Sequence, residues 1–512
     1  MLLLLACAPA TLNLGGTPDS PVPQDDSAGV IGTEEGSCNP TGEPVWGVEG
    51  EELSVTLRCA GTGEADRFEL GTLLPGAVIE GKKLVWTPEL DQAGHYEPLI
   101  LAFGPDGESR GSLDLWVADA WEARNNVPVD PATYEEEYGL PVLHLNRPQD
   151  TNEDEDVPAT MTYRGETYDL GLKYRGAASA YYPKRSYSLY FPADHEFKDE
   201  KTGFPKRRGI VLTSTFDDNS YFRQRMCFDI WNTLDPSRHS IATQMVVVYV
   251  NGSYEGLYLL GDHIDGEYWE DQGLFEDGNL YKSVDHSANF YDSYGGRPKS
   301  SLHSGYEKKE GTPRDGEAGA YDDLDELVTW VVQSDATTFR EELGDRLQVA
   351  QFMDWWILVR FTEADDSAGK NAYLYHDPAQ PLWYFAPWDF NHALGQTWQT
   401  ERQSADGTDE FRATNNLFRR MLEDAELSEE LRLRTVAALD GPLSKATLDA
   451  QIDAYVAETW PSMTRDWERW GSEYRSYGGW SWRSDWTTPE EEVAYIRDWV
   501  DDRRSNLARA YR

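Results

Sequence analysis

The residues with the clearest chemical potential lie between 365 and 395, in the stretch DDSAGKNAYLYHDPAQPLWYFAPWDFNHALG. Asp366 and Asn371 are five residues apart, and Asp389 follows two short strand-like runs that the turn-rich segment DPAQP joins. A carboxylate, an amide and a second carboxylate around a tight hairpin can converge on one metal–phosphate site, in the order that protein kinases use. The same residue types also cap ordinary turns, so the spacing alone leaves both interpretations open.

The composition restricts the partners of the chain. Its 512 residues include 46 Lys and Arg against 91 Asp and Glu, which gives a formal net charge of −45. A field of this sign repels nucleic acids and anionic membranes and attracts divalent cations. We therefore expect no nucleic-acid partner, and a bound nucleotide would need cationic side chains and a metal beside it.

The cationic half of such a site is expected upstream. Arg175 begins the small-residue run RGAAS between two predicted strands, where the backbone could approach a ligand closely. Lys184 opens the second of these strands, RSYSLYF, whose fixed backbone would hold its ammonium group against phosphates. The simpler alternative is a surface lysine whose aliphatic stem packs on a tyrosine.

The first residues have the pattern of an exported lipoprotein. Residues 1–7 read MLLLLAC, a lipoprotein-type signal segment in which Cys7 would carry the lipid. Residues 8–44 are rich in Pro, Gly, Ser, Thr and Asp and predict a flexible linker. We expect an exported protein, lipid-anchored at the bacterial cell envelope or surface. A cytosolic protein is the alternative, because the apolar run is short and no basic residue precedes it.

The remaining cysteines fit this location. An exported setting permits a disulfide between Cys38 and Cys59. Cys227 lies in the helical pattern RQRMCFDIW and is expected to be a buried core thiol rather than a nucleophile.

The rest of the chain predicts two folded regions. Residues 45–119 contain short alternating runs separated by turns, which is typical of a β-sandwich. Residues 130–512 begin with strands and end with helices, so we expect an α+β, two-lobed domain with a β-rich first lobe and a helical second lobe. The Asn251-Gly252 pair predicts a type I′ hairpin. The Ser- and Gly-rich stretch 285–318 predicts an irregular insertion.

Two families resemble these regions. The segment LPGAVIEGKKLVWTPELDQAGHYEPLILAF, within 45–119, is similar to the putative-immunoglobulin or cadherin-like modules of bacterial surface proteins. The segments DLGLKYRGAASAYYPKRSYSLYF, VVYVNGSYEGLYLLGDHID, NLYK and DDSAGKNAYLYHD…LWYFAPWDFNHALG, in this order, resemble the CotH kinase family. That second resemblance implies a diverged protein kinase that binds ATP and Mg²⁺ or Mn²⁺ between two lobes.

The resemblance to CotH kinases also implies residue roles. Asp366 would be the catalytic acid that receives the hydroxyl proton, and Asn371 and Asp389 would hold the metal. The residues expected to bind the nucleotide are Lys184, Arg175, Asp262, Tyr281, Lys282 and Trp383, of which Tyr281 and Trp383 could stack on adenine or could be core aromatics.

Two departures from the family pattern leave the function open. The family often has a second acid where this chain has Asn391, and Glu where it has Asp262. We expect an exported kinase that phosphorylates Ser or Thr in secreted or surface proteins. The alternative is a nucleotide-binding pseudokinase that acts as a surface structural or interaction protein.

Overall fold

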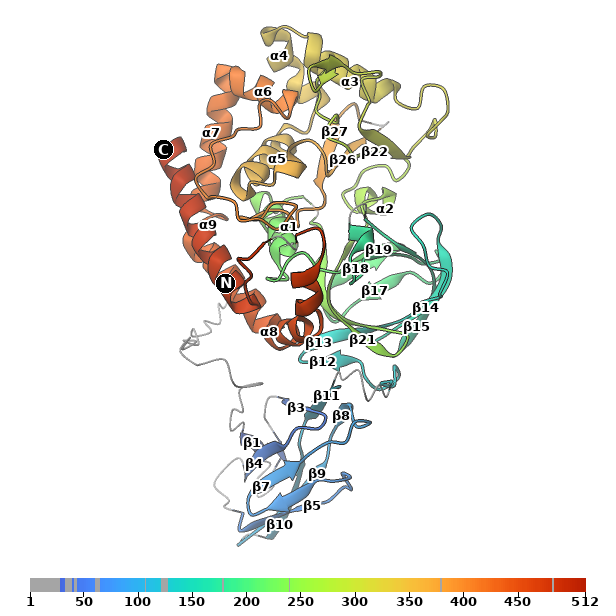
Figure 1. Ribbon diagram of the computed structural model, residues 1–512, viewed down its shortest axis with the longest axis vertical. Helices are drawn as coiled ribbons and strands as arrows, with labels where there is room; N and C mark the ends of the chain where they lie inside the picture. Colours follow the sequence, from blue (N-terminus) through green and yellow to red (C-terminus); the bar gives the residue numbers. More distant parts are fainter. Residues whose placement is uncertain are drawn as a thin grey trace. The chain divides into compact units, whose positions relative to one another are not determined.

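The computed structural model divides the chain into two compact units, Met1–Ala120 and Trp121–Arg512 (Figure 1). It describes residues 44–59, 65–105, 107–120, 128–176, 179–238, 240–377, 380–480 and 483–512, and the backbone alone for 28–32, 39–40 and Cys59. Cys7, Cys38 and most of the expected linker lie outside these residues. Lipid attachment and the Cys38–Cys59 pairing therefore stay predictions.

The described part of the first unit consists of strands. β1 and β2 join β4, β7 and β6 in one sheet, and two three-stranded sheets have the orders β10-β9-β5 and β3-β11-β8. Val55, Leu84, Trp86, Ile100 and Leu115 are fully buried and form the centre of its core. The strands are β1 Ala28–Gly32, β2 Asn39–Pro40, β3 Val45–Val48, β4 Leu53–Cys59, β5 Arg67–Leu70, β6 Val78–Glu80, β7 Lys83–Trp86, β8 Gly94–Tyr96, β9 Leu99–Gly104, β10 Gly107–Ser112 and β11 Leu115–Ala118.

A closed β-barrel forms the first half of the second unit. Its strands have the order β13-β14-β15-β16-β19-β21-β20, and β20 pairs in parallel with β13 to close the ring. The strands are β13 Leu140–Asn146, β14 Val157–Tyr163, β15 Glu166–Tyr174, β16 Tyr187–Tyr190, β19 Gly209–Thr213, β20 Thr243–Val250 and β21 Ser253–Asp262. The short strands β12 Glu136–Glu137, β17 Phe197–Asp199 and β18 Phe204–Arg207 flank them.

Alternation along the strands fills the barrel interior. In β14, Val157, Ala159, Met161 and Tyr163 are buried while the residues between them are not, and they join one apolar core with side chains of the other strands. The hairpin predicted at Asn251-Gly252 is confirmed: it joins β20 to β21. Both turn residues have positive φ, 52° and 80°, as a type I′ turn requires.

A second antiparallel sheet follows the barrel along the chain. Its order is β25-β22-β26-β27, formed by β25 Tyr306–Glu310, β22 Asn279–Ser283, β26 Ala372–His376 and β27 Trp383–Pro387. The expectation of an irregular insertion at 285–318 is wrong in part, because β23 Ser293–Tyr294, β24 Arg297–Pro298 and β25 lie within it. Backbone pairing with β22 fixes β25 although its sequence, YEKKE, has little apolar character.

Helices dominate the second half of this unit, which confirms the α+β expectation in its coarse form. They are α1 Arg223–Leu234, α2 Gly266–Glu270, α3 Asp322–Gln333, α4 Ala336–Arg346, α5 Val349–Thr362, α6 Asn416–Glu423, α7 Ala425–Asp440, α8 Lys445–Ser476 and α9 Pro489–Tyr511, with 3₁₀ turns η1 Ser179–Tyr181 and η2 Asp365–Ala368. In Figure 1, α8 and α9 run along the side of the unit opposite β14 and β15. In the described chain, every helix is too short or too polar to span a lipid bilayer.

Helix α5 is the centre of this helical half. Every residue from Gln351 to Thr362 is buried, because α5 packs against α1, α9 and strand β27. Its one buried acid, Asp354, accepts hydrogen bonds from Arg434 at 2.6 and 2.7 Å and from Arg238 at 3.0 Å. The predicted buried thiol is also here: Cys227 of α1 is free and fully buried.

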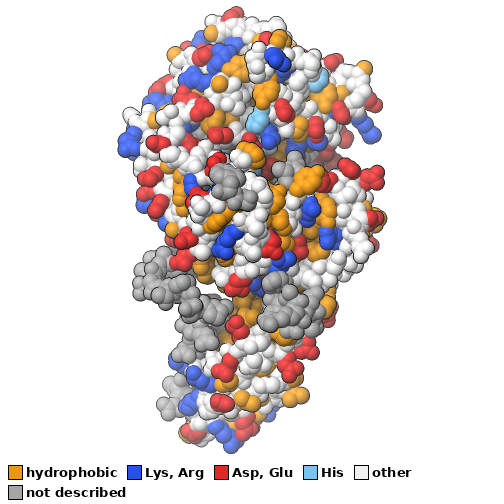
Figure 2. Space-filling model, viewed as in Figure 1, with side chains coloured by type: hydrophobic (Ala, Val, Ile, Leu, Met, Phe, Trp, Pro, Cys, Tyr) orange, Lys and Arg blue, Asp and Glu red, His pale blue; other side chains and the backbone are white. Residues whose placement is uncertain are grey.

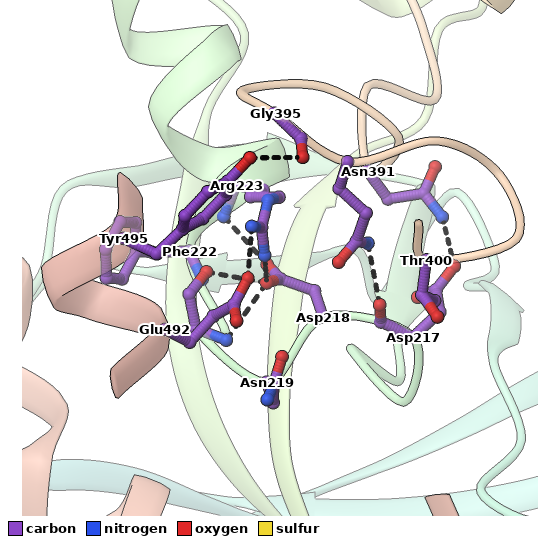
Figure 3. Close-up of polar contacts among 12 residues, drawn as sticks. Asp217, Asp218, Asn219, Phe222, Arg223, Asn391, Gly395, Thr400, Glu492 and Tyr495 are labelled. Carbon is purple, nitrogen blue, oxygen red and sulfur yellow. Dashed lines mark hydrogen bonds and ion pairs between the residues drawn. The ribbon is translucent and has the colours of Figure 1, made fainter. Parts of the chain in front are cut away.

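A buried ionic network joins the barrel to the last helix (Figure 3). Arg223, the first residue of α1, donates from Nη1 to Asp218 Oδ1 at 2.6 Å and from Nη2 to Glu492 of α9. Arg402 donates from Nη1 to the same carboxylate at 2.5 Å. Although burial opposes it, the charges of the two guanidinium groups lower the pKa of Glu492 to about 2.

We expect Glu492→Gln to lower the free energy of unfolding by about 3 kcal/mol at pH 7, since each unit of pKa shift is worth about 1.4 kcal/mol. A carboxyl whose folded pKa lies below its unfolded value stabilises the fold above about pH 4.5, and this contribution is lost as the pH falls toward 2. In urea unfolding, the difference in the free energy of unfolding between variant and wild type should therefore become smaller below pH 4. Glu490→Gln, an exposed site on the same helix turn, is the control and should change little. A constant difference from pH 7 to pH 3 would contradict this account.

Candidate active site

The hairpin β26–β27 brings Asn371 and Asp389 together. Ala372 pairs with Pro387, so the flanking residues Asn371 and Trp388 lie side by side at the open end of the hairpin, and Asp389 follows Trp388 directly. The amide of Trp388 donates to the carbonyl oxygen of Asn371 at 3.2 Å, and the amide of Asn371 donates to Ser283 at the end of β22. The pairing register therefore brings Asn371 close to Asp389 in the chain segment that follows β27.

Both residues have a strained backbone. Asn371 has φ of 56° and Asp389 has φ of 60°, in the left-handed region that non-glycine residues rarely adopt. The side-chain amide of Asn371 and the hydroxyl of Ser367 each donate to the carbonyl oxygen of Asp389 at 3.5 Å. Such conformations persist where surrounding contacts enforce them, and they cluster at functional sites.

Asp366 lies in η2, directly before this hairpin. Its carboxylate is half-buried and contacts Lys370 Nζ at 3.3 Å and His286 Nε2 at 3.4 Å. Ser367, the next residue, reaches Asp389, so the two predicted acids belong to one neighbourhood. Asp365, its neighbour in sequence, instead accepts a hydrogen bond from Gln403 at 3.1 Å.

Two predicted nucleotide-binding cations meet beside Asp389. The guanidinium of Arg175 lies 4.9 Å from the ring centre of Trp388, and Lys282 Nζ lies 5.4 Å from the same ring. Burial and the charge of Arg175 lower the pKa of Lys282 to about 8. Within the described chain neither cation has a carboxylate partner, so both have charge to offer a ligand.

Lys184 is not brought to this neighbourhood. Its side chain is fully buried between the barrel and α8, where Nζ donates to Asp466 Oδ2 at 2.5 Å and to the carbonyl oxygen of Leu257 at 2.7 Å. Tyr258 offers its ring face to the same ammonium group at 4.7 Å. An ammonium group with these partners has no access to a phosphate, because Asp466 of α8 and the backbone of β21 enclose it.

The other predicted residues are part of the interior. Asp262 accepts from Arg207 Nε at 2.7 Å, and burial raises its pKa to about 6, although it lines a small cavity together with Arg175, Trp388 and Asp389. Tyr281 donates to Asp323 at 2.5 Å and lies 5.8 Å from the ring of Trp383. Both aromatic rings are buried in the second sheet, which is the alternative that the sequence left open.

Sequence reasoning missed Asp217 and His392. Asp217 is buried in the loop after β19 and accepts from His392 Nε2 at 2.8 Å. It also accepts from Asn391 Nδ2 at 2.6 Å (Figure 3). Burial opposes the charged ring, but the hydrogen bond and charge of Asp217 raise the pKa of His392, and Asp389 and Asp366 raise it further. The run Asp217-Asp218-Asn219 at the end of a strand was the available signal.

A cleft of about 930 Å³ adjoins this neighbourhood. It lies between the barrel, represented by Tyr190 and Gly209, and the segment around Glu310. Tyr373 lies near both places, because its hydroxyl interacts electrostatically with Arg175 and Asp389 and also with Asp265, which lines the cleft. Burial and the charge of Asp265 raise the pKa of Glu310 to about 7.

Comparison with known proteins identifies the family. The model of the CotH kinase protein family matches residues 172–507. The chain belongs to the CotH kinase family. It is also similar to the inner spore coat protein H of Bacillus subtilis (strain 168), with 27% identity over 323 aligned residues. This alignment covers 62% of the present chain and 84% of the Bacillus protein.

The family match does not reach the first unit. Among solved structures, the chain is similar to an endo-fucoidan hydrolase of glycoside hydrolase family 107, with 14% identity and a TM-score of 0.13. The aligned part covers 28% of the present chain and 24% of the hydrolase chain. A match of that size carries no functional argument. CotH kinases are a family of atypical protein kinases, so the family implies ATP.

The donor atoms at the hairpin suit a hard divalent cation. Asp366, Asn371 and Asp389 offer carboxylate and amide oxygens, which Mg²⁺ and Mn²⁺ accept. No group of three or more His, Cys, Asp or Glu gathers into a metal cage in the part of the chain that the structure describes. This donor set fits a cation that takes its other ligands from phosphates and water, as Mg²⁺ does in kinases.

The two lysines should respond differently to substitution. Lys184→Met leaves Asp466 buried without its partner, so we expect a loss of about 3–5 kcal/mol in the free energy of unfolding. Lys282→Met, which breaks no ion pair, is the matched control and should change stability by less than about 1 kcal/mol. Urea unfolding of both variants at pH 7 measures this, and equal losses would contradict the placement of Lys184.

Proposed function

We propose that this chain is an active atypical protein kinase that transfers the γ-phosphoryl group of ATP to Ser or Thr hydroxyls of secreted or surface proteins. The observation that supports this most is the meeting of Asp366, Asn371 and Asp389 at one end of the hairpin, with Arg175 and Lys282 on the ring of Trp388. In this proposal the barrel and the helical half serve as the two lobes of the kinase.

Asp366 is proposed to receive the proton of the attacking hydroxyl. Its carboxylate is half-exposed, so an incoming side chain can reach it, and Lys370 and His286 fix its position. The transition state of phosphoryl transfer leaves little covalent work for the protein, so positioning and charge provide most of the rate.

Asn371 and Asp389 are proposed to hold the metal. The side chains of Asn371 and Ser367 both donate to the backbone carbonyl oxygen of Asp389, which fixes the Asn371 side chain and the Asp389 backbone before a ligand arrives and reduces the reorganisation that binding requires. A bound Mg²⁺ or Mn²⁺ would supply positive charge to the phosphate oxygens.

Arg175 and Lys282 are proposed to bind the phosphates from the other side. The nucleoside would lie in the adjoining cleft, whose wall includes Tyr190. This arrangement gives the phosphates local cations in a chain whose net charge is −45. Lipid attachment at Cys7 would keep the enzyme close to secreted or surface substrates, and the mass of the N-terminal peptide tests that part of the proposal.

A pseudokinase is the second candidate, and one observation favours it. Lys184 is held by Asp466 in the interior, so the lysine that the sequence singled out does not contribute to phosphate binding. A protein of this kind would bind nucleotide and act as a surface scaffold without transferring phosphate.

Phosphate incorporation from labelled ATP separates the two candidates. We expect wild type with Mg²⁺ or Mn²⁺ to label itself or a mixture of secreted proteins, and Asp366→Asn and Asp389→Asn to reduce labelling at least about 100-fold, since each removes a group that acts on the reacting atoms.

The matched control is Asp365→Asn, which removes the neighbouring acid and should retain most of the activity. Labelling that survives Asp389→Asn would overturn the metal assignment. If wild type binds ATP but labels no protein under any metal tried, the pseudokinase candidate replaces the kinase.

A further inference from the structure

His392 and Asp217 form a pair that the roles assigned above leave unused. His392 Nε2 contacts Asp217 Oδ2 at 2.8 Å, while Asn391 donates to the same oxygen at 2.6 Å. The carboxylate of Asp217 is almost fully buried, whereas the histidine side chain is 19% exposed. Nε2 is held by Asp217, whereas Nδ1 of His392 has no hydrogen-bond partner among the described residues and so has a proton to offer a ligand.

Several elements hold Asp217 in place. Gln396 donates to its carbonyl oxygen at 2.8 Å, and Tyr182 donates to its carboxylate at 3.3 Å. The next residue, Asp218, is held by Arg223. A buried carboxylate with this many donors remains ionised, and the burial of Asp217 makes its attraction for a charged partner strong.

The ring of His392 lies near an acidic neighbourhood. Asp389 and Asp366 act electrostatically on His392, so the ring lies within range of the proposed metal ligand and of the proposed proton acceptor. Tyr182 donates to Asp217, the partner of the ring, and Asn391 contacts Nε2 of the ring itself. A protonated His392 adds a third cation, besides Arg175 and Lys282, to the surroundings of Asp389.

We propose that His392 is a further phosphate-binding residue of this site, with its ring held on Asp217 and its Nδ1–H donated to a non-bridging oxygen of the transferring phosphoryl group. This inference rests on the proposed phosphoryl-transfer function. His392 keeps its proton throughout: the bond from the γ-phosphorus to the ADP oxygen breaks, the bond to the substrate oxygen forms, and the hydroxyl proton passes to Asp366. The ligand class is therefore a metal-bound polyphosphate.

Binding of inorganic tripolyphosphate with Mg²⁺, measured by calorimetry on the full chain, tests this inference without requiring catalysis. We expect wild type to bind more tightly at pH 6 than at pH 9, because both the His392 ring and Lys282, whose pKa is about 8, lose their charge as the pH rises. His392→Gln should weaken binding about tenfold at pH 6, the value of one charge-assisted hydrogen bond, and should reduce the pH dependence to the part that Lys282, with a pKa of about 8, supplies. His392→Arg should restore binding at pH 9.

The matched control is His376→Gln. His376 also pairs with an aspartate, Asp323, at 2.7 Å, but it stacks on Trp383 in the second sheet and should leave tripolyphosphate binding unchanged. Thermal unfolding of each variant shows whether it is folded. Asp217→Asn should also weaken tripolyphosphate binding at pH 6, since it removes the partner of the ring while leaving His392 in place.

The outcomes separate this inference from the kinase proposal. If His392→Gln binds tripolyphosphate as wild type does at both pH values, or if wild type binds none, the inference is overturned. If binding depends on His392 but no protein is labelled, phosphate binding by His392 holds and the kinase proposal fails. If labelling proceeds and does not change in a folded His392→Gln variant, the kinase proposal holds and His392 has no part in it.

Discussion

The buried guanidinium of Arg223 is the interaction on which the second unit depends most. It begins α1, contacts Asp218 in the loop after β19, and contacts Glu492 at the start of α9. A fully buried charge must be balanced by its neighbours, so these three segments can adopt few arrangements relative to one another. Because α1 packs on α5, and α5 leads into η2, the same network also influences where Asp366 lies.

Charge is the second constraint. The chain carries about twice as many acids as bases, and many described basic side chains are used in ion pairs such as Arg207–Asp262 and Arg434–Asp354. On the face shown in Figure 2, Lys and Arg side chains are interspersed with acidic ones. Arg175 and Lys282 differ, since an aromatic ring rather than a carboxylate holds each of them. Cations without carboxylate partners are therefore a more useful marker of this site than conspicuous acids.

Local signals in the sequence predicted local structure well. The Asn251-Gly252 turn, helix α1 and the hairpin that carries Asn371 and Asp389 each depend on neighbouring residues, and all three form as expected. Lys184 could not be placed in this way, because its partner Asp466 lies 282 residues further along the chain.

Sequence reasoning missed other residues for the same reason, that their partners are distant in the sequence. Asp217 and His392 are 175 residues apart and meet only through the tertiary fold. Barrel closure is likewise non-local: a strand pattern shows which face is buried but not which strand becomes the neighbour of β13. Strand β25 was also missed because its position depends on a non-local contact: its sequence is polar, and only backbone pairing with β22 places it in the second sheet.

The parallel β13–β20 pair also has a consequence for synthesis of the protein. Val142 pairs with Val247, so about 100 residues must follow β13 out of the ribosome before the ring can close. At about 5–20 residues per second, β13 waits for about 5–20 seconds with one edge unpaired. An unpaired strand edge is a template for association with other chains, so nascent chains of this protein depend on whatever protects that edge during translation.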